Sequence, residues 1–380
     1  MRTLILAASL VGPTLLGGAL APARAADAKP DLGANAALQY WQAFSTMHAF
    51  DLKENQKYID KWDTIPLDDD TKQIIANSRI RLQFLHRGAA IKNCDWGLTK
   101  EDGILMILPH LAQARNLARL AYLRARLEFE QGKAEAAVDD IADAFALGRH
   151  ATTDGSAIAA LVALSIDVMG QDLLAAHLKE LDAATLKHLA ARLEALPPGM
   201  MPRDSLKFEK ECGTAWLLAQ LKKTKQEEWP QFLASINARP EDIESIKKAG
   251  KPEEAYAALE KAGAYLDELA KLFPLPPDEF KQKVAALKEK MNPEAHPVAK
   301  MVLPAIERIY QAELRARVRR QLFAAAIAIA KGGKDHLKDF PDPVDGKPFE
   351  YVEREKGFEL RSRFMFQDKP TVLTVGPKKE

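Results

Sequence analysis

Apolar residues recur at the three-to-four-residue spacing of an amphipathic helix along most of this chain. In residues 34–50, Ala37, Tyr40, Phe44 and Met47 fall on one such stripe. Because each stripe must be buried against another element, a series of them predicts an array of packed helices. We expect helices at residues 34–50, 68–91, 104–108, 110–131, 133–149, 156–180, 183–196, 204–221, 253–272, 277–291 and 297–331.

Local signals mark where several of these helices begin and end. Asp68-Asp69-Asp70 precedes one helix, where carboxylates satisfy free amide groups and suit the positive helix end. Thr99 with Asp102 matches a capping box, and Pro109 is expected to break or kink the helix that follows this box. Asp182 is expected to cap a later helix. Pro197-Pro198-Gly199 ends that helix and is the clearest internal boundary. Beyond it, residues 222–252 are charged and predict a surface connection with short helices.

From Asp339 onward the spacing changes from helical to alternating. Phe349 and Tyr351 form one alternating run, Phe358, Leu360, Ser362 and Phe364 form another, and Lys356-Gly357 separates the two. This pattern predicts a β-hairpin, which Thr371–Val375 extends by a further strand.

The predicted fold class is mainly α. It is an irregular multi-helix array of antiparallel helix hairpins with a small C-terminal β-hairpin. We divide the chain into a signal peptide (1–25), an N-terminal helical domain (31–198), a second helical region (199–338) and a C-terminal turn and β-hairpin segment (339–380).

A weak tetratricopeptide-like spacing appears twice. Gly132, Ala137, Ile141 and Ala144 have the small-residue spacing of the second half of such a repeat, and residues 250–262 repeat that spacing. The interval between them is not a multiple of the usual 34 residues, and a regular array needs at least three adjacent repeats. We therefore interpret the two segments as ordinary helix hairpins.

The N-terminus has the three regions of a secretory signal peptide. Arg2 supplies positive charge, Leu4–Ala21 contains no charged residue, and Ala23-Arg24-Ala25 has the small-x-small cleavage pattern. We expect cleavage after Ala25 and a periplasmic or secreted protein. The longest later uninterrupted apolar run, Leu322–Ala330, would cover about 14 Å of a hydrocarbon core of about 30 Å. No membrane span is therefore expected after cleavage.

Composition excludes several classes of protein. The chain has 54 Lys and Arg against 53 Asp and Glu, a net charge of +1, which disfavours a nucleic-acid partner. Its 47% content of apolar residues excludes a disordered chain. The sequence contains no H-E-x-x-H, P-loop, G-x-G-x-x-G or G-x-S-x-G pattern. We therefore predict no catalytic residue, metal site or cofactor.

Arginines form two candidate clusters. Arg115, Arg119 and Arg126 share one helical face, which suits an anion pocket for phosphate, carboxylate or an acidic glycan. The alternative is that arginines of this helix pair with carboxylates and hold it against the next helix. A second cluster spreads around its helix and is expected to be a solvated surface; its members are Arg308, Arg315, Arg317, Arg319 and Arg320.

The two cysteines, Cys94 and Cys212, leave two alternatives open. In an oxidising compartment they could form one disulfide. They could equally remain unpaired, with Cys212 as a core residue on an apolar helix face. A nucleophilic Cys94 is disfavoured because no histidine lies near it in the sequence.

Two resemblances add to this interpretation. Asp342-Pro-Val-Asp-Gly-Lys-Pro-Phe-Glu-Tyr351 resembles the turn-and-strand segment at the end of the major pseudopilins of type II secretion. In that family this neighbourhood can hold calcium, but this chain lacks the family's N-terminal hydrophobic helix and Gly-Asp-rich ending. Only the local hairpin shape is therefore carried over.

The second resemblance is to an uncharacterised family of exported bacterial all-helical proteins. It covers most of the chain and rests on Cys94-Asp-Trp96, Leu108-Pro-His-Leu111, Gln131-Gly-Lys133 with Ala137-Val-Asp139, and the segment that begins at Asp342. The resemblance implies export and a helical architecture, and it implies no activity.

Two functions from different classes follow. The first is an exported, non-catalytic helical scaffold or binding protein of the cell envelope, whose partner is another envelope protein or an anionic ligand. The alternative is an envelope hydrolase that acts on an anionic polymer. That enzyme would use Glu209 or Glu211 beside Cys212, with Arg115 and Arg119 as electrophilic partners in the same cleft.

Overall fold

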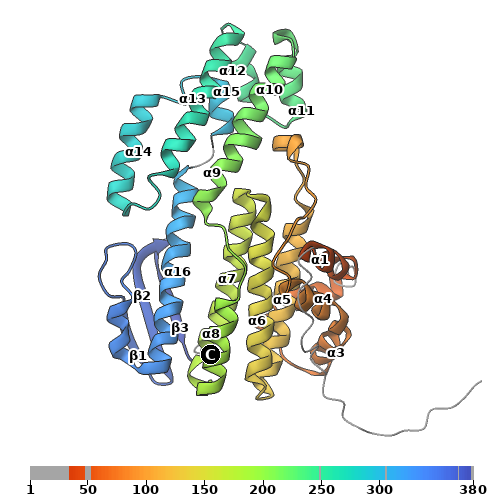
Figure 1. Cartoon of the computed structure of the whole chain (residues 1–380), viewed down its shortest axis with the longest axis vertical. Coiled ribbons are helices and arrows are strands. Elements are labelled where there is room, and N and C mark those ends of the chain that lie inside the picture. Colours follow the sequence, from red (N-terminus) through yellow and green to blue (C-terminus); the bar gives the residue numbers. More distant parts are fainter. Residues whose placement is uncertain (1–33, 48–52, 248–249, 304–305, 367, 378–380) are drawn as a thin grey trace, which may run out of the picture.

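The computed structural model describes residues 34–47, 53–247, 250–303, 306–366 and 368–377. Its described part is an elongated helical protein with a small antiparallel sheet beside one end (Figure 1). This arrangement confirms the predicted fold class. The expected signal peptide, residues 1–25, lies outside the described residues.

Three antiparallel helices form the centre of the lower half of Figure 1. They are α5 (Pro109–Glu130), α6 (Ala134–Ala151) and α7 (Ala157–His177). Gly132 has a φ of +70°, a left-handed conformation that glycine adopts without strain, so the chain turns there from α5 into α6. Ala137, Ile141 and Ala144 of α6 are fully buried, and the small side chains let α5 and α6 pack closely.

The N-terminal helices cover one side of this centre. They are α1 (Ala36–Ser45), α2 (Lys53–Asp60), α3 (Asp69–Asn77) and α4 (Arg79–Ala89). Asp68 caps α3 as expected, because its Oδ1 accepts from the Thr71 amide at 2.9 Å. The single helix predicted over 68–91 is wrong, since the chain breaks at Ser78, whose hydroxyl donates to the Ile74 carbonyl. Such local side-chain bonds compete with helix continuation.

The helix predicted over 104–108 is also wrong. Residues Lys100–Leu105 form a short 3-10 helix (η2) in which Gly103 has a φ of +56° and lies against the Trp216 ring. The Thr99 side chain makes no capping hydrogen bond. Pro109 does not interrupt a helix but begins α5, where its missing N–H costs nothing.

Helix α8 (Ala183–Glu194) begins at Asp182, whose Oδ1 accepts from the Thr185 amide at 2.7 Å, as the sequence predicts. After Pro197-Pro198-Gly199 the chain runs upward in Figure 1 through α9 (Ser205–Phe208), a π-helical segment (Glu209–Ala215) and α10 (Trp216–Lys223).

A second, smaller core lies at the upper end. It is enclosed by α10, α11 (Trp229–Ser235), α12 (Pro240–Lys247), α13 (Pro252–Ala270) and α15 (Pro297–Val302), with α14 (Pro277–Met291) beside α13. Its buried residues are Leu217, Leu221, Trp229, Leu233, Ile236, Ile246, Ala255, Leu259 and Val298. The short helices expected within 222–252 and the bounds predicted for α14 are confirmed.

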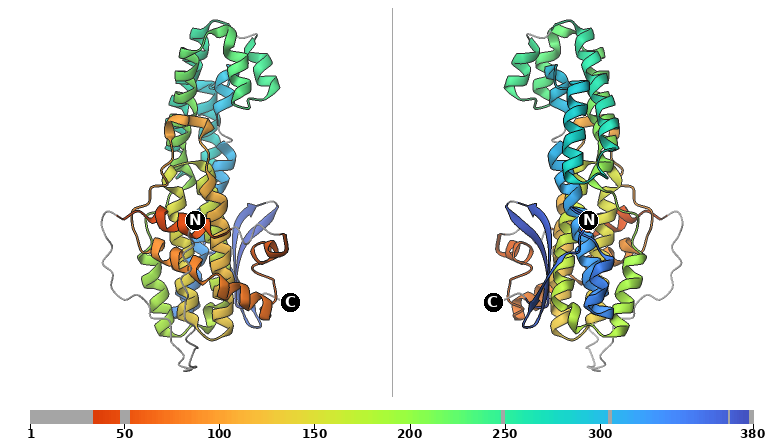
Figure 2. Two further views of the ribbon diagram at one scale, coloured as in Figure 1. Left: turned by 90° about the vertical axis from the view of Figure 1, so that its right-hand side faces the viewer. Right: turned by 90° about the vertical axis from the view of Figure 1, so that its left-hand side faces the viewer.

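The long helix α16 (Ile306–Gly332) runs down beside α7 into the lower half of the molecule. The sheet, in the order β1 (Glu350–Arg354), β2 (Gly357–Phe366), β3 (Lys369–Val375), packs on α16 and α7. Figure 2 shows it against one side of the lower helices. Phe358, Leu360 and Phe364 are buried, so the predicted hairpin and its third strand are confirmed.

Among the described residues, one helical segment is long and apolar enough to cross a membrane. It is Ala157–Glu180, and half of its most apolar stretch is buried inside the protein. It packs against α5, α6 and α16. A helix is expected here at residues 156–180, but uninterrupted apolar runs alone do not reveal that it is long and apolar enough for a membrane span.

Candidate ligand-binding site

The arginines predicted to bind an anion lie on α5, and the structure gives two of them protein partners. Arg115 is exposed. Arg119 lies 3.8 Å from a carboxylate oxygen of Asp60. Arg126 donates to the carbonyl oxygens of Trp62 and Ile65, at 2.5 and 3.1 Å. Arg119 and Arg126 therefore hold α2 and the segment after it against α5.

The neighbouring Arg124 forms the helix-to-helix pair that the alternative interpretation expects. Its Nε donates to Oδ2 of Asp140 on α6 at 2.5 Å, and its Nη2 donates to the other oxygen of that carboxylate. Glu128 lies 3.9 Å from the same guanidinium. Burial, reinforced by the charge of Asp140, raises the pKa of Glu128 to about 8.

Of the two alternatives for Cys94 and Cys212, the structure has the unpaired one: both cysteines are free and buried, and no disulfide joins them. The Sγ of Cys212 lies 3.9 Å from the carbonyl oxygen of Lys100 in η2, whereas the Cys94 thiol faces Thr153. Each thiol is thus held against a different partner. Burial raises the pKa of Cys94 to about 12 and also raises that of Cys212, so neither is an activated nucleophile at neutral pH.

Among the described residues, the acids proposed for a hydrolase lie near Cys212 but make no contact with the arginines proposed as their partners. Burial raises the pKa of Glu209, whose carboxylate accepts from the Ala157 amide. Glu211 is exposed and lies 3.9 Å from Lys207. Neither acid forms an ion pair or hydrogen bond with Arg115 or Arg119 in the part of the chain that the structure describes.

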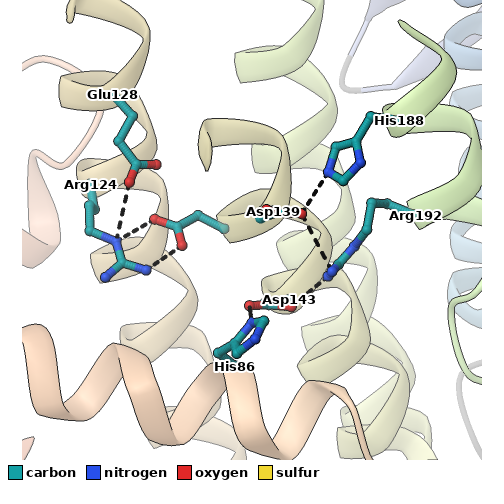
Figure 3. Close-up of polar contacts among 8 residues, drawn as sticks. His86, Arg124, Glu128, Asp139, Asp143, His188 and Arg192 are labelled. Carbon is teal, nitrogen blue, oxygen red and sulfur yellow. Dashed lines mark hydrogen bonds and ion pairs between the residues drawn. The ribbon is translucent and has the colours of Figure 1, made fainter. Parts of the chain in front are cut away.

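A network of charged side chains fixes α8 against α6 (Figure 3). Arg192 of α8 lies 2.6 Å from Asp143 and 3.4 Å from Asp139, both on α6. His188, also on α8, lies 2.8 Å from Asp139. His86 of α4 contacts Asp143 at 2.8 Å from the other side. The network sets the position of α8, whose next turn forms one wall of a pocket.

That pocket, of about 190 Å³, lies between α6, α7, α8 and α16. Its apolar lining consists of Phe145, Leu193, Leu196, Phe323, Ala324 and Ile327. Its polar lining consists of Arg149, Asp167, Gln171 and Arg320. A few polar groups among apolar walls are typical of a small-molecule site.

Two guanidinium groups meet one carboxylate in this pocket. Arg149 Nη2 lies 3.8 Å from Oδ2 of Asp167, and the Nε of Arg149 is buried without a hydrogen-bond partner in the part of the chain that the structure describes. Arg320 donates to the thioether sulfur of Met201 at 2.8 Å and, within the described residues, forms no ion pair. A thioether is a weak acceptor. Asp167 attracts Arg320 only at longer range, and it shares that attraction with Arg149.

The directions in which the pKa values of these groups are shifted agree with an excess of positive charge in the pocket. Burial lowers the pKa of Arg320, and the charge of Arg149 lowers it further. Burial raises the pKa of Asp167, while both arginines act in the opposite direction. An anion that entered the pocket would relieve the repulsion between the two guanidinium groups.

A larger and more open groove, of about 740 Å³, adjoins the same arginine. It lies between α16, the connection from α13 to α14, and the turn Pro341–Gly346, and Arg317 and Arg320 both line it. Arg317 donates to the carbonyl oxygen of Pro274 at 3.2 Å, and its Nε is buried without a partner. Arg320 therefore stands between two cavities.

The local sequence explains how these arginines come together. The chain passes over Arg149 at Gly199, where a Cβ would lie 2.1 Å from Nη1 of Arg149. The glycine in Pro197-Pro198-Gly199 therefore makes room for the guanidinium. On α16, Arg317 and Arg320 are one turn apart and share a face.

The second arginine cluster, on α16, was expected to be a solvated surface. The fold instead encloses part of it. Arg319 is only 4% exposed, and its guanidinium contacts Asp172 at 2.6 Å and the carbonyl of Val372 at 3.1 Å. Arg320 is half-buried. That expectation is therefore wrong for these two residues. The one available signal was the long apolar run that follows them, since it places this part of the helix in the core.

The turn that resembles the pseudopilin segment is held by protein donors. Asp342 is fully buried, and its Oδ2 accepts from the hydroxyl of Ser362 and the amide of Arg363, both at 2.8 Å. Its Oδ1 accepts from the amide of Val344 at 3.1 Å. The carboxylate thus ties the turn to β2. The turn and the hairpin together have the local shape that the resemblance implies.

Comparisons of the chain with protein-family models, curated proteins and solved structures find no match. We therefore infer function from the chemistry of the described side chains.

Proposed function

We propose that this protein is an exported, non-catalytic binding protein that holds an anionic ligand with an apolar part at Arg320. The observation that carries this proposal is the half-buried guanidinium of Arg320, which among the described residues has only a thioether sulfur as its hydrogen-bond partner. A guanidinium presents a planar set of donors that matches carboxylate and phosphate oxygens.

The surrounding charges favour an anion over a neutral ligand. Arg149 and Arg320 face the single carboxylate of Asp167, and Arg149 keeps an unpartnered Nε. A carboxylate ligand would accept from these donors and balance the excess charge. Cationic ligands would be repelled by the same groups.

The pocket walls favour a ligand that also has an apolar part. Phe145 and Phe323 are buried beside the polar groups, and Leu193, Leu196 and Ile327 complete the wall. Each methylene group that a ligand buries there contributes about 0.8 kcal/mol. The open groove on the other side of Arg320 gives such a ligand a route to the arginine.

The site is held in place by interactions that do not involve a ligand. Arg192 and His188 fix α8 on α6, and α8 carries Leu193. Arg319, next to Arg320, is fixed by Asp172. A preformed site loses less conformational entropy on binding, which favours affinity.

The N-terminal pattern and the resemblance to exported helical proteins support export. Cleavage after Ala25 would release a mature chain that begins at Ala26. A non-catalytic role is supported by the raised pKa of both thiols and by the separate partners of Glu209, which accepts from the Ala157 amide, and of Arg119, which lies beside Asp60.

Isothermal titration calorimetry with octanoate tests this function. We expect the mature protein to bind octanoate, and octanol, which lacks the charge, to bind much more weakly. Arg320→Gln should weaken octanoate binding by at least about tenfold, the effect of removing a charge-assisted hydrogen bond.

Arg115→Gln is the matched control, because Arg115 is an exposed arginine of the face predicted from sequence. It should leave octanoate affinity unchanged. Loss of binding in Arg115→Gln but not in Arg320→Gln would place the anion on α5 and refute the proposal. Equal binding of octanol and octanoate by the wild-type protein would refute it without any variant.

A further inference from the structure

The pocket and the open groove at Arg320 are two parts of one surface of α16. Four side chains of this helix recur at a spacing of three or four residues and therefore share one face; they are Arg317, Arg320, Ala324 and Ile327. Arg317 and Arg320 line the groove, whereas Ala324 and Ile327 line the pocket together with Arg320. A ligand whose anionic group lies at Arg320 therefore has a cavity on each side of that group.

The sizes of the two cavities suit different parts of a ligand. The pocket, of about 190 Å³, is smaller than the sites of about 300–1,000 Å³ that hold drug-sized molecules, so it suits one apolar side chain. The groove, of about 740 Å³, lies within that range and takes a larger part of the ligand. A simple fatty acid would fill the pocket and leave the groove unused.

The groove adds positive charge to that of Arg320. Arg317 donates to backbone carbonyl oxygens and forms no ion pair with any described residue. Both acids that line the groove are used within the protein: Asp342 accepts from its own turn and from β2, and Asp345 lies 3.3 Å from the guanidinium of Arg363. A ligand carboxylate in the groove therefore meets two guanidinium groups, and guanidinium donors match carboxylate oxygens.

The remaining lining of the groove suits a peptide main chain. Gln321 is half-buried, and its side-chain amide forms no hydrogen bond with any described residue. This amide offers one acceptor oxygen and two donors, which match the C=O and N–H of a peptide unit. The rest of the wall is mainly apolar and consists of Pro274, Pro276, Pro341, Pro343 and Val344.

Both walls of the groove are held by contacts within the protein. On one wall, the hydroxyl of Tyr310 donates to the carbonyl of Leu275 at 2.9 Å, and Arg317 donates to the carbonyl of Pro274 at 3.2 Å. On the other wall, the amide of Gly346 donates to the carbonyl of Asp342 at 2.8 Å. A ligand therefore need not order these segments when it binds, which favours affinity.

From these observations we infer that the ligand at Arg320 is the C-terminus of a peptide or protein whose last residue is apolar. This inference rests on the proposed anion site and names the ligand that the site takes. The α-carbon of a C-terminal residue joins a carboxylate, a side chain and a main chain. The carboxylate lies at Arg320, the side chain fills the pocket, and the main chain runs into the groove beside Gln321.

The two cavities favour this ligand over a lipid. A phospholipid also combines an anionic group with apolar and polar parts. It has two long acyl chains, however, and a pocket of about 190 Å³ is too small for them. The peptide places only one side chain there.

Isothermal titration calorimetry with related probes tests the inference. The first probe is the tripeptide acetyl-Gly-Ala-Leu with a free C-terminal carboxylate. We expect it to bind at least about tenfold more tightly than the same peptide with a C-terminal amide, which lacks the charge. We also expect it to bind more tightly than acetyl-leucine, which lacks the residues that enter the groove, and than dihexanoylphosphatidylglycerol, which represents a lipid.

A pair of glutamine variants on α16 tests the groove itself. Gln321→Ala should lower the affinity for the tripeptide about fivefold more than the affinity for octanoate, the effect of losing one neutral hydrogen bond. Gln311→Ala is the matched control, because Gln311 is exposed on the same helix and lines neither cavity. It should change neither affinity. Circular dichroism checks that both variants are folded.

The outcomes separate this inference from the proposed function. If octanoate bound at Arg320 but the free-acid and amide tripeptides bound equally, the inference would be overturned and the anion site would stand. Tighter binding of the lipid than of the free-acid tripeptide would also overturn it, and so would equal affinities of the tripeptide for wild type and a folded Gln321→Ala. If neither octanoate nor the tripeptide bound, the proposed function itself would fail.

Discussion

Arg192 on α8 donates to Asp143 on α6 across 2.6 Å, and this contact joins two helices that are not consecutive in the chain. The other oxygen of Asp143 accepts from His86 on α4 at 2.8 Å. That hydrogen bond is the main reason that the pKa of His86 is raised. One buried carboxylate thus connects three helices (Figure 3). Helix α8 continues from it into the wall of the pocket around Arg320.

Replacing Asp143 by Asn should destabilise the protein by about 1–3 kcal/mol, because Arg192 and His86 would both lose a charged acceptor. Urea unfolding followed by circular dichroism measures the change. Glu135→Gln, an exposed change on the same helix, is the control and should stay within about 0.5 kcal/mol of wild type. Equal stability of the two variants would show that the network contributes little.

The raised pKa of Glu128 predicts that the stability of the protein depends on pH. Burial raises its pKa from an ordinary 4.5 to about 8, so the folded state keeps a proton that the unfolded state releases within this window. The protonated carboxyl therefore contributes fully to the free energy of unfolding below about pH 4.5, and this contribution is lost as pH rises through about 8. The free energy of unfolding should fall with pH by at most about 1.4 kcal/mol per pH unit.

The variant Glu128→Gln isolates this effect, because glutamine imitates the protonated carboxyl and does not titrate. Urea unfolding of both proteins at pH 5, 7 and 9 should show wild type losing stability relative to the variant as pH rises. His86, with its raised pKa, acts in the same direction in both proteins and cancels in the comparison. A difference that is constant with pH would contradict the raised pKa of Glu128.

Two glycines in the contact between α6 and α7 make a matched pair. A Cβ at Gly170 would lie 2.5 Å from Cε1 of Phe145 and 2.8 Å from the hydroxyl oxygen of Tyr122. At Gly148 the nearest atom, of Ile166, would lie 3.4 Å away. Gly170→Ala should therefore cost about 1–3 kcal/mol through overpacking, whereas Gly148→Ala should change stability by less than about 1 kcal/mol. Thermal unfolding measures both; similar melting temperatures would mean that Phe145 moves without cost.

Sequence was a good guide wherever a short segment decides its own structure. Asp182 caps α8, and the chain turns from α5 into α6 at Gly132. Residues 277–291 form a helix with both of its predicted bounds. These signals act within a few residues, so they do not depend on the rest of the fold. The alternation in residues 358–364 is equally local, because one face of the sheet must be buried.

The sequence was a poor guide wherever distant segments decide the outcome. The helix expected around Ile104 gives way to η2, which packs against Trp216 more than a hundred residues later. The arginines of α16 looked solvated because helical spacing alone cannot show that β3 and α7 cover them. Arg149, Asp167 and Arg320 come from three helices, and no spacing in the chain could have predicted their meeting.

Export can be checked on the protein itself. Intact mass measurement of the protein from the periplasmic or secreted fraction should show a chain that begins at Ala26, with both thiols free to react with iodoacetamide after unfolding. The same protein with residues 2–25 deleted should stay in the cytosol. Finding the full-length chain with Met1 in the soluble cytosolic fraction of cells that express the whole gene would refute export.

The apolar wall at Arg320 predicts how affinity depends on the length of the ligand. Because each buried methylene contributes about 0.8 kcal/mol, a series from butanoate to hexanoate to octanoate should gain about fourfold in affinity per carbon until the pocket is full. Calorimetry of the series measures this slope. Phe323→Ala should flatten it by removing a buried wall of the pocket, whereas Arg320→Gln should lower every affinity by a similar factor and keep the slope, because it removes only the contact with the carboxylate. A series without any dependence on length would show that the anion binds in the open groove, away from Phe145 and Phe323.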